Sequence, residues 1–101
     1  MSPRLPIQRD QVVAFCQRNG IRRLSLFGSV LRDDFGPDSD VDVLVEFAPG
    51  VRFGYIGLMA MQEELAGVVG RPVEMYAPSW LRPWMREEVE ASAELFYESA
   101  E

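Results

Sequence analysis

The sequence predicts a single small domain of the α/β (α+β) class, and three observations support this class. The chain has 101 residues, two of its segments carry apolar residues at helical spacing, and an alternating apolar run lies between those segments. A chain of this length has room for one hydrophobic core, since single cores usually span roughly 100 to 200 residues. We therefore expect residues 1–101 to form one domain, with helices packed on a small mixed sheet of three to four strands.

The first two helices are predicted from apolar spacing and from the glycines that end them. The first covers about residues 7–19 and is followed by Gly20, and the second is followed by Gly70. Glycine closes a helix at this position because it adopts left-handed backbone angles without steric cost. The inward-facing residues recur every three or four positions: Val12, Phe15 and Cys16 in the first helix, and Leu58, Met61, Leu65 and Val68 in the second.

The remaining pattern predicts a third helix and several short strands. The helix is expected from about residue 80, with Ser79 as its N-cap. Its inward-facing residues would be Leu81, either Trp84 or Met85, and Val89. Apolar β-prone runs predict strands over 21–27, 41–47 and 73–76, and a short last strand over 95–97.

The composition excludes several kinds of catalytic chemistry. The chain has no histidine, so catalytic triads and histidine-ligated zinc are absent. All ten basic residues are arginine, so there is no phosphate-loop lysine and no Schiff-base lysine. An active site in this chain would depend on carboxylates and hydroxyls.

The charge and the cysteine content indicate the compartment and the kind of partner. The net charge of −6 has the wrong sign for holding duplex phosphates, so nucleic acid is not expected as the main partner. The single Cys16 forms no internal disulfide and is expected to be a buried structural thiol, which favours a reducing compartment. No apolar run reaches the roughly 18 residues needed to cross a bilayer. We expect a cytoplasmic protein.

One segment carries residues suited to nucleotide chemistry. Gly28-Ser29 directly follows the first predicted strand, where glycine allows a backbone to approach a phosphate closely and Ser29 adds a hydroxyl donor. Asp40 and Asp42 are two positions apart in a strand, so their side chains lie on the same face and can share a cation. Mg²⁺ takes oxygen ligands, usually one or two carboxylates together with substrate phosphates and water.

Two other interpretations of this segment are possible from the residues alone. Asp38, Asp40 and Asp42 resemble the start of an EF-hand loop, but Val43 and Pro49 stand where that loop needs glycine and glutamate, which excludes it. The second interpretation is a simple turn followed by the polar side of an exposed strand. The Gly28-Ser29 turn and the pair Asp40 and Asp42 occur together and are flanked by apolar strands. This combination favours a magnesium–nucleotide site.

The same residues resemble a known family. The signature of the minimal nucleotidyltransferases (MNT), a branch of the DNA polymerase beta superfamily, is similar to two segments of this chain: Phe27-Gly28-Ser29 and residues 39–47 (Ser-Asp-Val-Asp-Val-Leu-Val-Glu-Phe). Ten residues separate Ser29 from Asp40. The resemblance extends over nearly the whole chain and implies the nucleotidyltransferase fold.

The resemblance implies roles for six residues. Gly28, Ser29 and Arg32 would bind the nucleotide, and Asp40, Asp42 and Glu74 would be the catalytic metal ligands, with two Mg²⁺ ions expected. The sequence departs from the family pattern twice. Asp33 follows Arg32 where the family commonly has glycine, and Glu74 stands where the third carboxylate is usually aspartate.

The resemblance also implies an activity and a partner. The chain would transfer AMP from ATP to a hydroxyl of a partner protein, as an antitoxin that pairs with a HEPN-type RNase toxin. One alternative is a binding module, weakened at Asp33 and Glu74, that neutralises its partner by masking it, and another is a nucleotide sensor. The apolar run 51–61 and the pair Trp80 and Trp84 predict a homo- or hetero-oligomeric interface. The six glutamates after Arg86 form either a solvated face or a dock for a basic partner.

Overall fold

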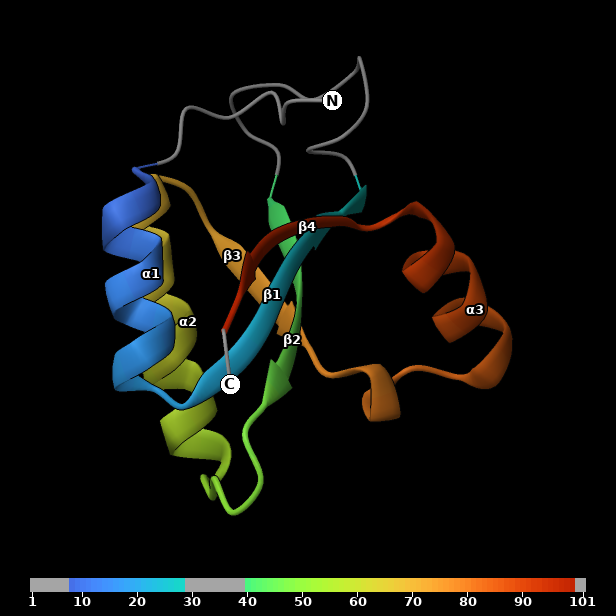
Figure 1. Cartoon of the computed structure of the whole chain (residues 1–101), viewed down its shortest axis with the longest axis horizontal. Coiled ribbons are helices and arrows are strands. Elements are labelled where there is room, and N and C mark those ends of the chain that lie inside the picture. Colours follow the sequence, from blue (N-terminus) through green and yellow to red (C-terminus); the bar gives the residue numbers. More distant parts are fainter. Residues whose placement is uncertain (1–7, 29–39, 100–101) are drawn as a thin grey trace.

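The structure, a computed structural model, describes residues 8–28 and 40–99 of the chain. It contains a four-stranded mixed sheet in the order β3-β2-β1-β4, with helices on both sides (Figure 1). The elements follow in the order α1 (Arg9–Arg18), β1 (Ile21–Phe27), β2 (Val41–Phe47), α2 (Tyr55–Val69), β3 (Val73–Tyr76), the short 3₁₀ helix η2 (Pro78–Trp80), α3 (Pro83–Ser92) and β4 (Glu94–Glu98). The predicted fold class, including the mixed sheet and the short last strand, is confirmed.

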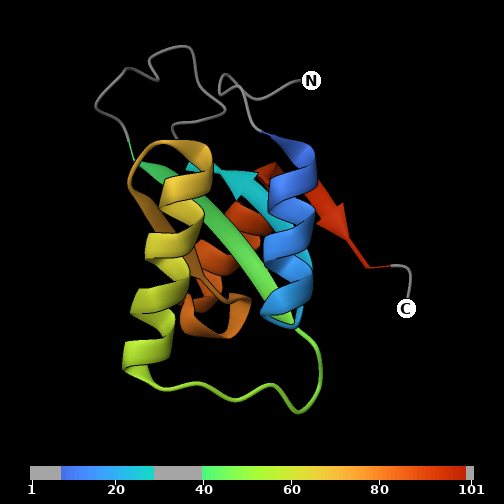
Figure 2. The same cartoon turned by 90° about the vertical axis from the view of Figure 1, so that its left-hand side faces the viewer.

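The two faces of the sheet have different coverings. β1 runs antiparallel to both β2 and β4, whereas β3 runs parallel to β2. Helices α1 and α2 lie side by side on one face, and α3 stands on the other side of the sheet (Figures 1 and 2). The parallel pairing follows from the α2 crossover, since parallel strands need a long connection.

The hydrophobic core lies between the sheet and the pair α1 and α2. The alternating residues Val41, Val43 and Val45 are all buried, as the sequence pattern predicts. Phe15 of α1 and Leu65 of α2 pack into the same cluster. Full burial of side chains of this size contributes about 1.5 to 3 kcal/mol each, so this face supplies most of the stability.

The first two helices end as predicted. Gly20 and Gly70 have φ angles of 68° and 77°, in the left-handed region that glycine adopts readily. The first helix begins at Arg9, two residues later than expected. No helix in the parts of the chain that the structure describes is long and apolar enough to cross a membrane.

The predicted start and packing of the third helix are wrong. Helix α3 begins at Pro83 rather than near residue 80, and Ser79 lies within η2 instead of capping α3. Proline fixes its own φ and forces the preceding residue into an extended conformation, so a helix starts at Pro83 and cannot pass through it. No residue of α3 is buried, and the Trp84 side chain is 66% exposed.

A network of charges links three strands on the surface. Arg23 of β1 binds Glu46 of β2 at 3.1 Å and Glu98 of β4 at 2.6 Å. These ion pairs raise the pKa of Arg23, chiefly through its hydrogen bond to Glu98. Because all three side chains are about two-fifths exposed, solvent screens both ion pairs and they add little to the stability of the fold.

The burial of Cys16 predicts an inert thiol in the native state. Burial raises the pKa of Cys16 from its usual 9.0 to about 12. We expect iodoacetamide at pH 8 to label the native protein about a thousandfold more slowly than the unfolded protein, because the thiolate is the reactive form. Mass spectrometry of timed reactions, with and without urea, measures this ratio, and equal rates would contradict the burial.

The same pKa change gives the pH dependence of stability. The neutral Cys16 thiol contributes fully below pH 9, where the folded and the unfolded chain are both protonated. Above pH 9 only the unfolded chain ionises, so the free energy of unfolding is expected to fall as the pH rises toward 12. Urea titrations at pH 8 and pH 10 measure this decrease in the free energy of unfolding. The part of the decrease that comes from the Cys16 thiol should be absent in a Cys16→Ala variant.

Candidate functional site

The acidic residues predicted from the sequence lie at one end of the sheet. Strand β1 ends at Phe27, while β2 and β3 begin at Val41 and Val73. Because β1 is antiparallel to β2, and β2 is parallel to β3, these three chain ends meet at the same end of the sheet (Figure 1). Asp42 pairs with Phe27 on one side and with Glu74 on the other. The strand pairing therefore places two of the predicted catalytic residues on adjacent strands in register.

These carboxylates lie on the face of the sheet that α1 and α2 leave uncovered. Successive side chains of a strand point to opposite faces, so Asp42 and the buried Val41 and Val43 point in opposite directions. Asp40 directly precedes β2, and the spacing of two positions places it on the side of Asp42. Asp42 is partly buried, whereas Asp40 and Glu74 are exposed. The acidic face is therefore open to solvent and to ligands.

Gly28 is in direct contact with the carboxylate of Asp42. Its φ of 79° lies in the left-handed region. A Cβ atom added to Gly28 would lie 2.5 Å from Oδ2 of Asp42, which is closer than real Cβ contacts. Glycine is therefore required here for two reasons, the backbone conformation and the close approach of the carboxylate.

The structure adds a residue that the sequence interpretation missed. Tyr76 follows Glu74 by two positions in β3, and its ring meets Phe27 edge to face, with 5.6 Å between the ring centroids. Burial raises the pKa of Tyr76, and the negative charges of Glu74, Asp42 and Asp40 raise it further. The alternation of residues 73–76 was the available signal, because it places Tyr76 on the same face as Glu74.

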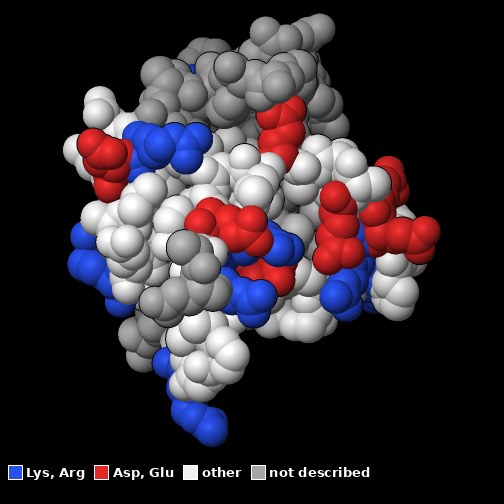
Figure 3. Space-filling view, viewed as in Figure 1, with Lys and Arg blue, Asp and Glu red and all other residues white. Residues whose placement is uncertain are grey.

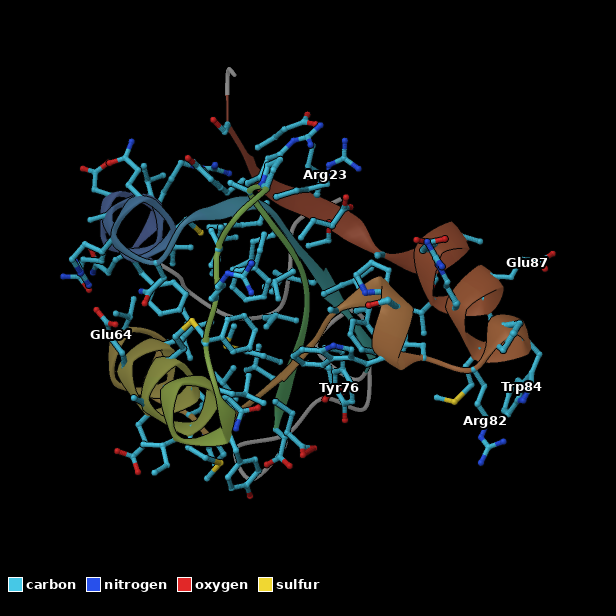
Figure 4. The ribbon with its side chains drawn as sticks, turned by 90° about the horizontal axis from the view of Figure 1, so that it is seen from below. Arg23, Glu64, Tyr76, Arg82, Trp84 and Glu87 are labelled. Carbon is cyan, nitrogen blue, oxygen red and sulfur yellow. The ribbon has the colours of Figure 1, made fainter. Side chains whose placement is uncertain are left out.

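Ser29, Arg32 and Asp33 lie outside the described residues, so their roles stay predictions. Arg82, at the N-cap of α3, points away from the sheet (Figure 4). A cavity of about 300 Å³ lies between Phe27, Gly28 and α3. The Gly28 turn therefore borders this cavity on one side and the Asp42 carboxylate on the other.

The donor atoms at this end of the sheet suit a hard divalent cation. Asp40, Asp42 and Glu74 offer only carboxylate oxygens, the ligands that Mg²⁺ prefers. Among residues 8–28 and 40–99, however, no three acidic, cysteine or histidine side chains are grouped closely enough to hold a metal by themselves. The described residues thus provide part of a ligand set. This fits the way Mg²⁺ is usually bound, by one or two carboxylates and the phosphates of a substrate.

Comparison with known proteins identifies the family of the fold and site. Residues 9–96 match the nucleotidyltransferase domain family. A protein from Methanocaldococcus jannaschii that is assigned as a protein adenylyltransferase is 28% identical over 81 residues, which cover 80% of this chain and 85% of the relative. This family match confirms the class of enzyme expected from the sequence, a nucleotidyltransferase.

Two solved structures show the same architecture. One, assigned as a minimal nucleotidyltransferase, is 34% identical, with a TM-score of 0.69 over 84% of this chain and 85% of the other. The second is a complex of a tri-AMPylated HEPN toxin from Shewanella oneidensis with its MNT antitoxin. It is 16% identical, with a TM-score of 0.66 over 90% of this chain and 70% of the matched chain, a likeness of fold alone. From the family match and the more similar structure, the chain belongs to the nucleotidyltransferase domain family, within its minimal nucleotidyltransferase branch.

Proposed function

We propose that this chain transfers AMP from ATP to a hydroxyl group of a partner protein, in a reaction that requires Mg²⁺. The observation that carries the proposal is the position of Asp42, which contacts the Gly28 turn and pairs in register with Glu74. A phosphate-binding turn and the metal-binding carboxylates must be adjacent in such a reaction, because Mg²⁺ would be held by the carboxylates together with the phosphates of the substrate. The assignment of the Methanocaldococcus relative as a protein adenylyltransferase supports AMP as the transferred group.

The residues divide between holding the nucleotide and activating the acceptor. The backbone at Gly28 approaches the triphosphate, and Ser29 and Arg32 are proposed to contact its phosphates. Asp40 and Asp42 would hold Mg²⁺, which when bound neutralises the phosphate charge and lowers the pKa of the acceptor hydroxyl. Glu74 would complete the ligand set or accept the hydroxyl proton as a general base.

The transfer replaces one phosphorus–oxygen bond with another. The acceptor oxygen forms a bond to the α-phosphorus of ATP while the bond between that phosphorus and the bridging oxygen of the β-phosphate breaks. Pyrophosphate leaves with the electron pair of the broken bond, and the hydroxyl proton passes to Glu74 or to water. Since the chain has neither histidine nor lysine, a carboxylate is the ordinary group available as the base.

We propose a HEPN-type toxin as the partner that supplies the hydroxyl, with the chain acting as its antitoxin. The AMPylated HEPN toxin in the Shewanella complex supports this pairing. An exposed apolar set on the described surface provides contact area for a partner: Phe53, Tyr55, Ile56, Met59, Trp80, Trp84, Met85 and Leu95. Acidic side chains gather over α3 and would suit a basic partner (Figure 3). The single buried cysteine favours the reducing cytoplasm as the site of the reaction.

A second candidate function is neutralisation by masking without catalysis. The observation that favours it is the incomplete ligand set among the described residues, together with glutamate at position 74. A masking protein would need neither metal nor nucleotide, so its complex with the partner would form in EDTA. Neutralisation by an Asp40→Ala, Asp42→Ala double variant would then equal that of the wild type.

The catalytic proposal predicts that Asp42 is essential for AMP transfer. With ATP labelled at the α-phosphate, Mg²⁺ and a host extract, we expect a labelled protein band with the wild type. Asp42→Asn should lower the labelling rate at least about a hundredfold, because the substitution removes a negative ligand of the metal. Removal of divalent cations with EDTA should abolish labelling in the same assay.

Asp10→Asn is the matched control for this experiment. Asp10 is an exposed aspartate in the first turn of α1, on the helix-covered side of the sheet. Its variant should label the band at the wild-type rate. Undiminished labelling by Asp42→Asn would refute the catalytic assignment, and a wild type that binds its partner in a pull-down without labelling it would favour masking.

The close contact at Gly28 predicts that an alanine there disrupts the site. Gly28→Ala and Gly50→Ala both place a side chain at a left-handed φ, 79° and 87°, so each should destabilise the fold by about 1 kcal/mol. Only at Gly28 would the new Cβ meet the Asp42 carboxylate, since no atom lies within 4 Å of a Cβ at Gly50. Urea titrations should therefore show similar decreases in the free energy of unfolding for the two variants. The rate of AMP transfer should fall only in Gly28→Ala. Equal transfer rates in the two variants would argue against the role of this contact.

A further inference from the structure

The cavity of about 300 Å³ beside Gly28 separates α3 from the end of β1. Phe27 and Gly28 line one side of it. The other side is lined by residues of α3 that recur at helical spacing: Trp84, Met85, Glu88, Val89 and Ser92. Figure 1 shows α3 standing away from the sheet, between η2 and β4. One face of α3 is therefore turned toward the cavity and not packed on the sheet.

The apolar side chains on this face of α3 are exposed. Trp84 is 66% exposed and Met85 is 36% exposed, although both line the cavity. A helix of ten residues is only marginally stable by itself in water, because most helices in proteins are stabilised by the packing of an apolar face. Exposed apolar surface of this kind usually marks an interaction site. The cavity-lining face of α3 is therefore suited to burial against another molecule.

The same part of the chain is strongly acidic. Residues 83–98 contain five glutamates and one arginine, so this segment carries a net charge of −4 out of the −6 of the whole chain. Arg86 pairs with Glu90 at 3.5 Å. Glu88 lines the cavity, is exposed, and forms no ion pair with another described residue. An apolar surface with an unpaired negative charge is complementary to a segment that carries apolar and basic side chains.

The cavity lies next to the site of the proposed reaction. Gly28 forms part of the cavity wall, and a Cβ atom at Gly28 would lie 2.5 Å from Oδ2 of Asp42. A protein segment bound in the cavity would therefore lie beside the carboxylates, where the acceptor hydroxyl has to be placed for the transfer. This position favours the acceptor protein as the occupant of the cavity.

We propose that the acceptor protein docks in this cavity through a basic amphipathic helix. An apolar side chain of that helix fills the space between Gly28 and Trp84, and a lysine or arginine beside it pairs with Glu88. The inference rests on the proposed function, because it names the chemistry by which the same site recognises its acceptor. It also gives a reason for the exposed apolar face of α3, which becomes buried in the complex.

The test measures docking separately from catalysis. The probe is a fluorescein-labelled peptide of leucine and lysine with its leucines at helical spacing, and fluorescence anisotropy gives its dissociation constant. A peptide of the same composition in scrambled order is the control for charge alone. The protein variants are Trp84→Ala and Glu88→Gln, at two residues that line the cavity. Glu87→Gln is the matched control, because Glu87 is the adjacent exposed glutamate and points away from the sheet (Figure 4).

Trp84→Ala should weaken binding of the amphipathic peptide at least about tenfold, as truncation of a large contact residue does at other interfaces. Glu88→Gln should weaken it about three- to fivefold, the range of one exposed ion pair. Glu87→Gln should bind the peptide as the wild type does. In the labelling assay with host extract, the amphipathic peptide should compete with the acceptor and lower the labelling of its band, with half inhibition near the measured dissociation constant.

The outcomes separate this inference from the proposed function. Equal binding of the two peptides, or equal effects of Glu87→Gln and Glu88→Gln, overturns the docking surface, because attraction to the net charge would explain either result. Unchanged affinity in Trp84→Ala overturns it as well. A peptide that binds with the expected pattern but leaves labelling unchanged overturns the acceptor as the occupant. A wild type that labels no protein overturns the proposed reaction, and the peptide affinities then decide the docking surface by themselves.

Discussion

The pairing of β2 with β1 on one side and β3 on the other is the constraint on which the rest of the structure depends. Strand β2 is central, and its residues Val41, Val43 and Val45 are buried against α1 and α2. The same strand carries Asp42 on its other face. A slip of one residue in its register would exchange these two faces, so the burial of the valines also fixes the carboxylate. The energy of the core thus determines where the acidic groups of the site lie.

The two faces of the sheet have different roles, because one stabilises the fold and the other carries the candidate site. One face is dry and apolar, and substitutions there would chiefly change folding. The other face carries the carboxylates, Tyr76 and the Gly28 turn, with only a thin cover from η2 and α3. Because Asp42 and Glu74 lie on paired strands, their spacing is maintained by backbone hydrogen bonds, and this suits a reaction that depends on geometry.

The fold could be predicted largely from local patterns, whereas the site could be predicted only in part. The alternation in β2 and the glycines at positions 20 and 70 act over a few residues, so the sequence identifies their elements. Ser79 has the side chain of a helix cap, but the fixed backbone angle of Pro83 determines where α3 begins. The position of Tyr76 near negative charges of two strands depends on strand register, which no local pattern encodes. For the same reason the sequence identifies Asp42 and Glu74 as candidates without showing that they are neighbours.

The order of the strands also has a consequence for folding. β1, β2 and β3 are joined by successive connections, whereas β4 pairs with β1 from the far end of the described chain. During synthesis the strands that carry the acidic residues are complete before β4 leaves the ribosome. In that interval the outer edge of β1 presents unpaired N–H and C=O groups, a template on which a strand of another chain can add. The pairing of β4 with β1 therefore protects the protein against aggregation. The nascent chain is most prone to aggregate just before β4 pairs with β1.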